Sequence, residues 1–180
     1  AYNLIVRTRD GGKSWEPWFD RTDNPKFFNL YAIRPAAGDV YVVGESGVVL
    51  KLDESAQRFR ALSLPYNGSF FGVVETGSAV LVFGLRGNAF RSQDGGSTWT
   101  KVDTGLAASI VGATRATRGA LLLADVGGRL AQSTDDGRTF SQIGLKPQLR
   151  IVNGDVYFQT IGNQDTKAGA GFANWFQDYP

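Results

Sequence analysis

Three short acidic turns recur along this chain, and their carboxylates are the side chains best suited to chemistry. Asp10, Asp94 and Asp135 each stand in the pattern Ser/Thr-x-Asp-x-Gly-x-Ser/Thr-aromatic. A carboxylate in such a turn could bind a metal ion or a polar ligand through its oxygens. It could instead accept hydrogen bonds from the backbone N–H groups of its own turn. We favour this second, architectural role, because it also explains the glycine and the hydroxyl that follow.

Each acidic turn ends at an aromatic residue, and together with Phe59 these aromatics recur at intervals of 44, 40 and 41 residues. The glycine of the turn takes backbone angles closed to other residues, and we expect the aromatic ring to fill space between neighbouring sheets. A fourth copy, residues 52–59, lacks the glycine and keeps only its aromatic, Phe59. The structural residues of the three full copies are Asp10, Gly12 and Trp15, then Asp94, Gly96 and Trp99, and finally Asp135, Gly137 and Phe140.

The elements that must position these turns are short strands. Gly47, Gly87 and Gly128 occupy equivalent places before the strand that leads into each turn, and a glycine there suits a tight hairpin with positive φ. Two apolar runs precede each of these glycines, as in 30–33 and 39–43. The unit is therefore four antiparallel strands in about 40 residues, which is the size of a propeller blade. The sequence predicts an all-β protein, a β-propeller of about four blade equivalents.

The blades are expected within residues 1–160. Residues 2–19 form a partial blade, and 149–160 supply two strands of another. The complete blades are expected at 29–62, 70–102 and 110–143. Residues 161–180 depart from the pattern as a tail with four aromatics, Phe172, Trp175, Phe176 and Tyr179. Either the two partial blades close a small ring, or other sequence or a second copy covers the open edges, since exposed edges favour self-association.

Composition narrows the class of function. The chain has 19 basic and 17 acidic residues, so a nucleic-acid partner is not expected. Histidine and cysteine are absent, which removes thiol chemistry, serine–histidine triads and the usual zinc ligands. We therefore expect no cofactor and no metal. No apolar run is long enough for membrane insertion. Because the sequence starts with Ala inside a predicted strand, we expect a truncated or processed N-terminus.

The acidic turns resemble Asp-boxes, also called BNR repeats, which occur in sialidases and in the photosystem II stability/assembly factor-like proteins. Residues 43–50 (VGESGVVL) and 5–15 (IVRTRDGGKSW) are more similar to the second group. The resemblance covers about residues 2–143. It implies a segment of a seven-bladed ring, and a non-enzymatic scaffold for assembly or stability. It further implies a protein partner, such as a membrane-protein complex under assembly, and export to a periplasm or lumen.

A sialidase-type glycoside hydrolase is the alternative from a different class. Such an enzyme needs three arginines around one carboxylate, a Tyr/Glu nucleophile pair and an acid/base Asp. The nearest approach to the family's Arg-Ile-Pro signature is residues 32–35 (AIRP), in which the order is altered. Arg34 is more simply a surface charge. The four glutamates do not sit beside tyrosines in a way that suggests an activated nucleophile.

In a propeller, the acidic turns and the hairpins between the first two strands share one face, and the remaining loops share the other. We call the second the partner face, because such folds usually bind partners there. Its loops mix arginine, tyrosine and asparagine with both charge signs, which suits a protein surface, although they could also be plain solvated loops. The candidate partner-binding residues are Arg21, Asp23, Lys26, Glu45, Tyr66, Asn67, Arg86 and Asp125.

Overall fold

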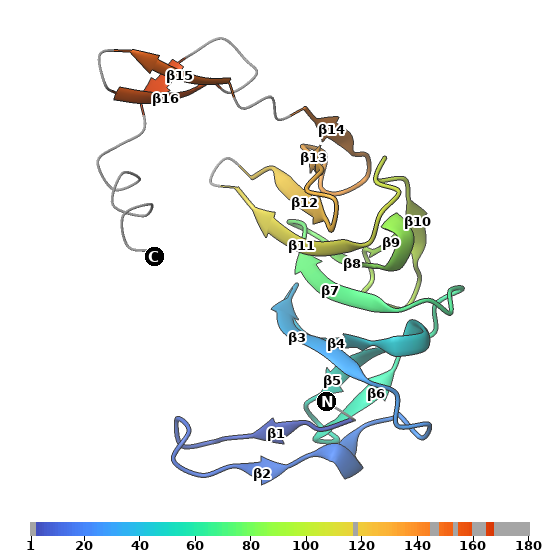
Figure 1. Ribbon diagram of the computed structural model, residues 1–180. Coiled ribbons are helices and arrows are strands. Elements are labelled where there is room, and N and C mark those ends of the chain that lie inside the picture. Colours follow the sequence, from blue (N-terminus) through green and yellow to red (C-terminus); the bar gives the residue numbers. More distant parts are fainter. Residues whose placement is uncertain (1–2, 117–118, 145–147, 153–154, 160–164, 168–180) are drawn as a thin grey trace. The chain divides into compact units, whose positions relative to one another are not determined.

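The computed structural model describes residues 3–116, 119–144, 148–152, 155–159 and 165–167. The chain divides into two units, residues 1–142 and 143–180. Apart from three 3₁₀ turns, every regular element of the described residues is a β-strand (Figure 1). None of the described helical segments is long and apolar enough to cross a membrane.

A hairpin and three four-stranded antiparallel sheets account for the strands up to residue 143. We call the sheets blades I, II and III, and each begins at its innermost strand, β3, β7 or β11. The hairpin consists of β1 (Val6–Arg7) and β2 (Glu16–Pro17), followed by the turn η1 (Phe19–Arg21). Blade I contains β3 (Leu30–Ala36), β4 (Asp39–Gly44), β5 (Val49–Asp53) and β6 (Arg58–Ala61), with η2 (Glu45–Gly47) between β4 and β5.

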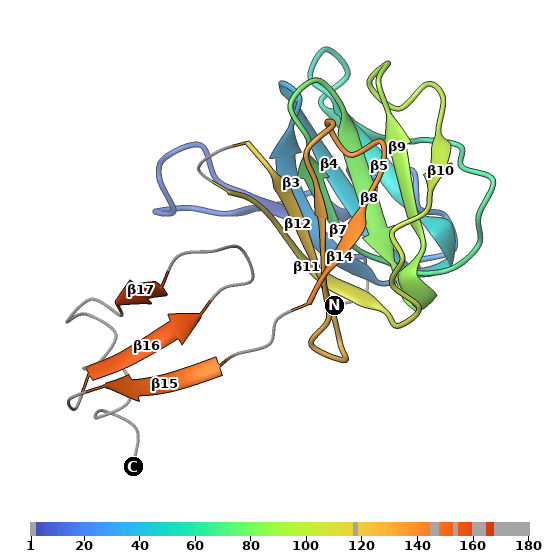
Figure 2. The same cartoon turned by 90° about the horizontal axis from the view of Figure 1, so that it is seen from above.

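The other two blades repeat this plan, and Figure 2 shows the strands of blade II side by side in chain order. Blade II contains β7 (Phe70–Glu75), β8 (Val80–Gly84), β9 (Ala89–Ser92) and β10 (Thr100–Val102), with η3 (Leu85–Gly87) after β8. Blade III contains β11 (Ile110–Arg115), β12 (Leu121–Asp125), β13 (Leu130–Ser133) and β14 (Ser141–Ile143). The predicted all-β propeller fold is confirmed.

Burial explains why the second strand of each blade was the clearest in the sequence. Every residue of β8 is buried, so this strand is covered on both faces and appears as an unbroken apolar run. The last four residues of β4 are buried in the same way. In the inner strand β3, Tyr31 and Ile33 are exposed on the face that does not pack against the sheets, and Arg34 and Pro35 near its end are exposed as well.

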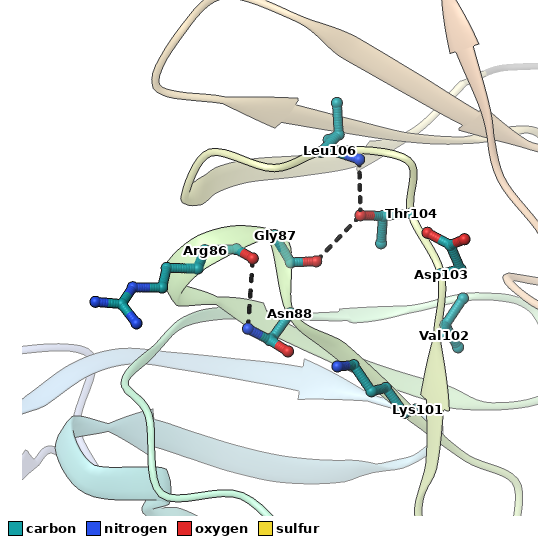
Figure 3. Close-up of a pocket in the computed structure, with 8 residues that line it drawn as sticks. All are labelled: Arg86, Gly87, Asn88, Lys101, Val102, Asp103, Thr104 and Leu106. Carbon is teal, nitrogen blue, oxygen red and sulfur yellow. Dashed lines mark hydrogen bonds between the residues drawn. The ribbon is translucent and has the colours of Figure 1, made fainter.

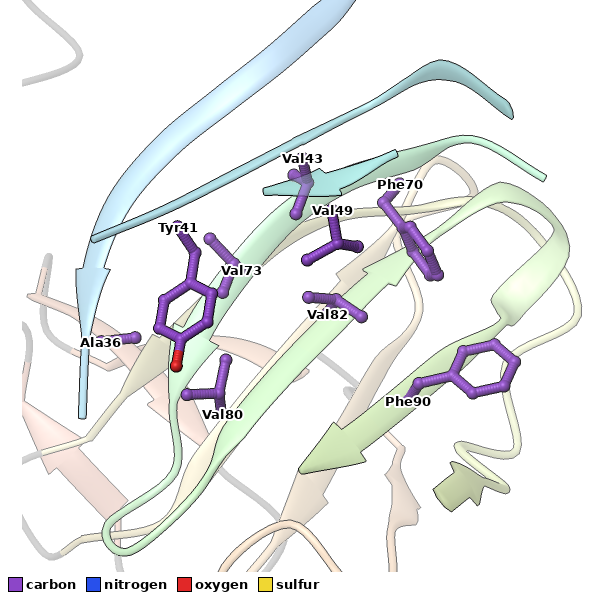
Figure 4. Packing of buried hydrophobic residues seen from close by; sticks show 9 residues of the cluster. All are labelled: Ala36, Tyr41, Val43, Val49, Phe70, Val73, Val80, Val82 and Phe90. Atoms are coloured by element: carbon purple, nitrogen blue, oxygen red, sulfur yellow. The ribbon is translucent and has the colours of Figure 1, made fainter. Parts of the chain in front are cut away.

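The core lies between adjacent blades. Figure 4 shows the cluster between blades I and II, in which Tyr41 and Val43 of β4 face Val80 and Val82 of β8. Phe70 and Phe90 meet edge to face with their ring centroids 5.9 Å apart. A second cluster joins blades II and III around Leu81. Each large side chain buried there contributes about 1.5–3 kcal/mol, so the blades stabilise one another.

The unit of residues 143–180 contains a three-stranded antiparallel sheet of its own. Its strands are β15 (Gln148–Val152), β16 (Asp155–Gln159) and β17 (Asp165–Lys167). The first two correspond to the strands expected at 149–160. The third adds a strand within 161–180, the segment expected to depart from the blade pattern. The four aromatics of that segment lie outside the described residues.

Candidate functional site

The carboxylate of each acidic turn is saturated by hydrogen bonds from its own turn. Asp94 Oδ1 accepts a hydrogen bond from the backbone N–H of Thr98 at 2.8 Å, and Oδ2 accepts one from the Thr98 hydroxyl at 2.6 Å. The Ser92 hydroxyl donates to Asp94 and accepts from the N–H of Gly96. Asp10 and Asp135 have equivalent partners.

These bonds favour the ionised carboxylate. The hydroxyl and N–H of Thr98 lower the pKa of Asp94 to about 2, and those of Ser14 lower the pKa of Asp10 to about 2. Among the described residues, no group of three acidic side chains is placed to hold a metal ion. The turn carboxylates therefore act as internal hydrogen-bond acceptors of their hairpins.

Three of the four aromatics, Phe59, Trp99 and Phe140, pack against the preceding sheet or hairpin. Phe59 is buried beside Trp18 of the hairpin, with ring centroids 6.2 Å apart. Trp99 packs on the core between blades I and II, and Phe140 on the core between II and III. Trp15 differs from the expected packing, because it is 59% exposed. It belongs to the first hairpin of the described residues, so no earlier sheet packs against it.

The acidic-turn face also carries contacts between blades that the sequence analysis missed. Arg91 of blade II reaches the turn of blade III, where its Nε donates to the backbone oxygen of Asp136 at 2.7 Å. Lys51 of blade I contacts the backbone oxygen of Gly95 in the same way. Lys51 and Arg91 each follow a hairpin glycine, Gly47 or Gly87, by four residues. This repeated spacing is the sequence signal from which the contacts between blades could have been predicted.

Several of the residues predicted to bind a partner already form ion pairs or hydrogen bonds within the fold. Asp23 forms an ion pair with Arg58 at 2.6 Å, and Glu45 accepts hydrogen bonds from the backbone and side chain of Asn29. Tyr66 is half-buried, and its hydroxyl donates to the backbone oxygen of Leu85 at 3.2 Å.

Asp125 was predicted to lie on the surface of the partner face, but the structure buries its side chain. Its side chain is 0% exposed and pairs with Arg129 at 2.8 Å. Burial alone would raise the pKa of Asp125, but hydrogen bonds from Arg129 and Gly127 outweigh burial and lower it. The remaining predicted residues, Arg21, Lys26, Asn67 and Arg86, are exposed.

Of the residues predicted to bind a partner, Arg86 lines a pocket. The pocket has a volume of about 440 Å³ and lies between η3 and the loop that joins blades II and III (Figure 3). Arg86 lies in the left-handed backbone region, with a φ of 55°. Its backbone N–H donates to the hydroxyl of Ser109 at 3.3 Å. The lining residues are Arg86, Gly87, Asn88, Lys101, Val102, Asp103, Thr104 and Leu106.

Close backbone packing gives this pocket its floor. The backbone oxygen of Leu106 would lie 1.7 Å from a Cβ at Gly87, so only glycine fits there. The Thr104 hydroxyl donates to the Gly87 backbone oxygen at 3.1 Å and accepts from the N–H of Leu106 at 3.2 Å (Figure 3). The lining includes two cations, Arg86 and Lys101, and one carboxylate, Asp103. Figure 3 shows the Arg86 side chain pointing away from Lys101, so each cation presents a separate positive charge to an anionic group such as a carboxylate.

Successive four-stranded sheets, each with an acidic turn before its outermost strand, define the class as a BNR-repeat β-propeller. The family described as photosynthesis system II assembly factor YCF48 matches residues 1–140. The chain belongs to this family, so the resemblance predicted from the repeats is confirmed. No curated protein matches the sequence.

Two solved structures have the same fold. One, titled "YCF48 bound to D1 peptide", is 17% identical with a TM-score of 0.62, and the match covers 93% of this chain and 57% of that one. The other, YCF48 from Cyanidioschyzon merolae, is 16% identical with a TM-score of 0.58, and the match covers 89% of this chain and 58% of that one. This chain therefore spans less than three-fifths of the length of either structure.

Proposed function

We propose that this chain is part of a non-enzymatic scaffold that binds a segment of a partner protein on its partner face. The observation that carries the proposal is the pocket lined by Arg86 and Lys101. Membership of the YCF48 family supports an assembly role. The structure titled "YCF48 bound to D1 peptide" supports a polypeptide ligand.

The chemistry of the pocket favours an acidic group of that segment. A guanidinium such as that of Arg86 binds a carboxylate through two parallel hydrogen bonds, and the Lys101 ammonium adds a second positive charge to the lining of the pocket. Among the described residues, neither cation has a salt-bridge partner in the fold. Both cations are exposed, so we expect solvent to screen them and each to contribute modestly.

We further propose that the partner belongs to a membrane-protein complex under assembly, and that it is a photosystem II protein or its counterpart. Family membership and the peptide-bound relative support this identity. The partner face would then hold the segment while other subunits join the complex.

Peptide binding tests the proposal. The full chain is titrated with a D1 peptide by isothermal calorimetry, with Arg86→Gln and Lys101→Gln as test variants. Each variant is expected to raise Kd roughly fivefold and to weaken the salt dependence of binding. Arg34→Gln is the matched control, because Arg34 is exposed on β3 and outside the pocket. Binding that is equal in all three variants contradicts the proposed site.

The glycoside hydrolase alternative has weaker support. A sialidase requires three guanidiniums around one carboxylate, whereas Arg86 is the one arginine among the residues that line the described pocket. Arg34 donates to the backbone oxygen of its neighbour Ile33. Release of a fluorophore from a sialoside, abolished by Arg34→Ala, would favour the enzyme.

A further inference from the structure

The inner strand of each blade contains a β-bulge at the same position. The pairing register shifts between Leu30 and Ala32 in β3, and the corresponding shifts fall at 70–72 in β7 and 110–112 in β11. The extra residues are Tyr31, Phe71 and Val111. A bulge leaves one residue unpaired and turns its side chain away from the regular pleat, and bulges are frequent next to binding sites.

These three residues form an apolar row, which we call the bulge row. Tyr31 is 47% exposed and Val111 is 52% exposed, while Phe71 is half-buried. The rings of Tyr31 and Phe71 are in contact, with centroids 5.6 Å apart. Strand β7 contacts both β3 and β11, so the row runs across all three blades (Figure 1).

The row ends at an apolar hollow. Tyr31 borders a hollow of about 130 Å³ whose lining includes Leu4 and Ile33. Ile33 is 46% exposed and Leu4 is 56% exposed. The hollow adjoins the core between the hairpin and blade I, because Ile5, Leu30 and Val42 also line it and belong to that core. Leu4, Tyr31 and Ile33 lie at the exposed margin of this core and are not among its members. Exposed apolar side chains gathered on neighbouring strands in this way are typical of an interaction site.

The other end of the row lies beside the cation pocket. Ser109, whose hydroxyl accepts the hydrogen bond from the Arg86 N–H, is two residues before Val111. One ligand could therefore contact both. In an extended strand, alternate side chains on one face are about 6.7 Å apart. This spacing is close to the 5.6 Å between the first two rings of the row.

We propose that the bulge row binds alternate apolar side chains of an extended polypeptide segment whose acidic group lies at Arg86 and Lys101. This inference rests on the proposed function and adds the sequence pattern of the partner. The positive charge at one end of the row and the apolar hollow at the other also give the segment a direction, with its acidic group nearest blade III.

The test compares two synthetic peptides of equal composition on the full chain by fluorescence anisotropy. One carries leucines at alternate positions followed by an aspartate, and the other carries the leucines in one block. We expect the alternating peptide to bind roughly tenfold more tightly. Tyr31→Ser and Val111→Ser should each remove most of that difference, whereas Val111→Leu should keep it.

Trp15→Ser is the matched control, because Trp15 is 59% exposed but lies in an acidic turn. Unchanged binding in both serine variants, with weaker binding in Arg86→Gln, refutes the bulge row and leaves the proposed function standing. Unchanged binding in all of them contradicts both proposals. If the serine variants abolish self-association of the chain but leave peptide binding intact, the row is a contact between copies, and the inference is wrong.

Discussion

Replacing Asp136 by alanine tests how blades II and III are held together. The carboxylate of Asp136 lies in the acidic turn of blade III, where Oδ2 pairs with Arg91 Nη2 of blade II at 2.6 Å. Its oxygens also accept hydrogen bonds from the Thr76 hydroxyl at 2.8 Å and the Ser78 hydroxyl at 2.6 Å. All three partners come from blade II.

The expected loss of unfolding free energy follows from burial. The Arg91 side chain is only 7% exposed and that of Asp136 is 19% exposed. Removing one partner of a buried ion pair costs about 3–5 kcal/mol, because the remaining charge loses its counter-charge. Since Asp136 is partly exposed, we expect about 3 kcal/mol for Asp136→Ala. Asp136→Asn keeps one acceptor oxygen but loses the charge, and should cost less.

Urea denaturation of the full chain measures this loss. Asp20→Ala serves as the control, because Asp20 is an exposed aspartate in η1 and its replacement should change stability by less than about 0.5 kcal/mol. A double-mutant cycle with Arg91→Met isolates the coupling between the two charges. A loss below about 1 kcal/mol in Asp136→Ala, or strict additivity in the cycle, would refute the reasoning.

The remaining predictions concern the pocket floor, the turns and the core. Gly87→Ala should cost at least about 3 kcal/mol by urea denaturation, because the Leu106 oxygen occupies the space of the new Cβ. Gly38→Ala, with a similar positive φ but open space, should lose only about 1 kcal/mol, and equal losses would contradict the contact. Hydrogen bonds depress the pKa of Asp10 and Asp94 to about 2 in the fold, so their stabilisation is complete above about pH 4 and is lost as the pH falls through 2. A urea midpoint that stays constant between pH 5 and 2 would contradict this linkage. Leu81→Ala should cost about 3 kcal/mol by the same assay, since Leu81 is fully buried, and a loss under 1 kcal/mol would contradict its place in the core.

The fold could be predicted from the sequence because its signals are local. The run at 39–43 indicated a strand, and β4 spans Asp39–Gly44. A strand covered on both faces must be apolar throughout, and the acidic turn after the next strand fixes where the chain reverses. The repeated order of these signals then indicated blades.

The contacts between blades could not be predicted in the same way. The carboxylate of Asp136 is bound by residues of blade II that precede it by 45 to 60 positions. The sequence likewise indicated an exposed position for Asp125, but its side chain is buried. Burial is possible because Arg129, in the same hairpin, neutralises its charge. Gly87 was expected for its positive φ, which it has, but its contact with Leu106 depends on where the next loop passes.

The two faces of the blades differ in whether their polar side chains are already bonded within the fold. On the acidic-turn face, Asp94 and Asp136 already accept hydrogen bonds at both carboxylate oxygens, so a ligand would have to break internal bonds before making new ones. On the partner face, Arg86 and Lys101 have no salt-bridge partner among the described residues, and Tyr31 remains half exposed. A ligand there would displace water only, which costs less free energy than breaking hydrogen bonds within the protein. The repeat motif that identifies the family therefore uses its polar groups within one face, whereas the irregular residues between the repeats leave charged and apolar side chains exposed on the other.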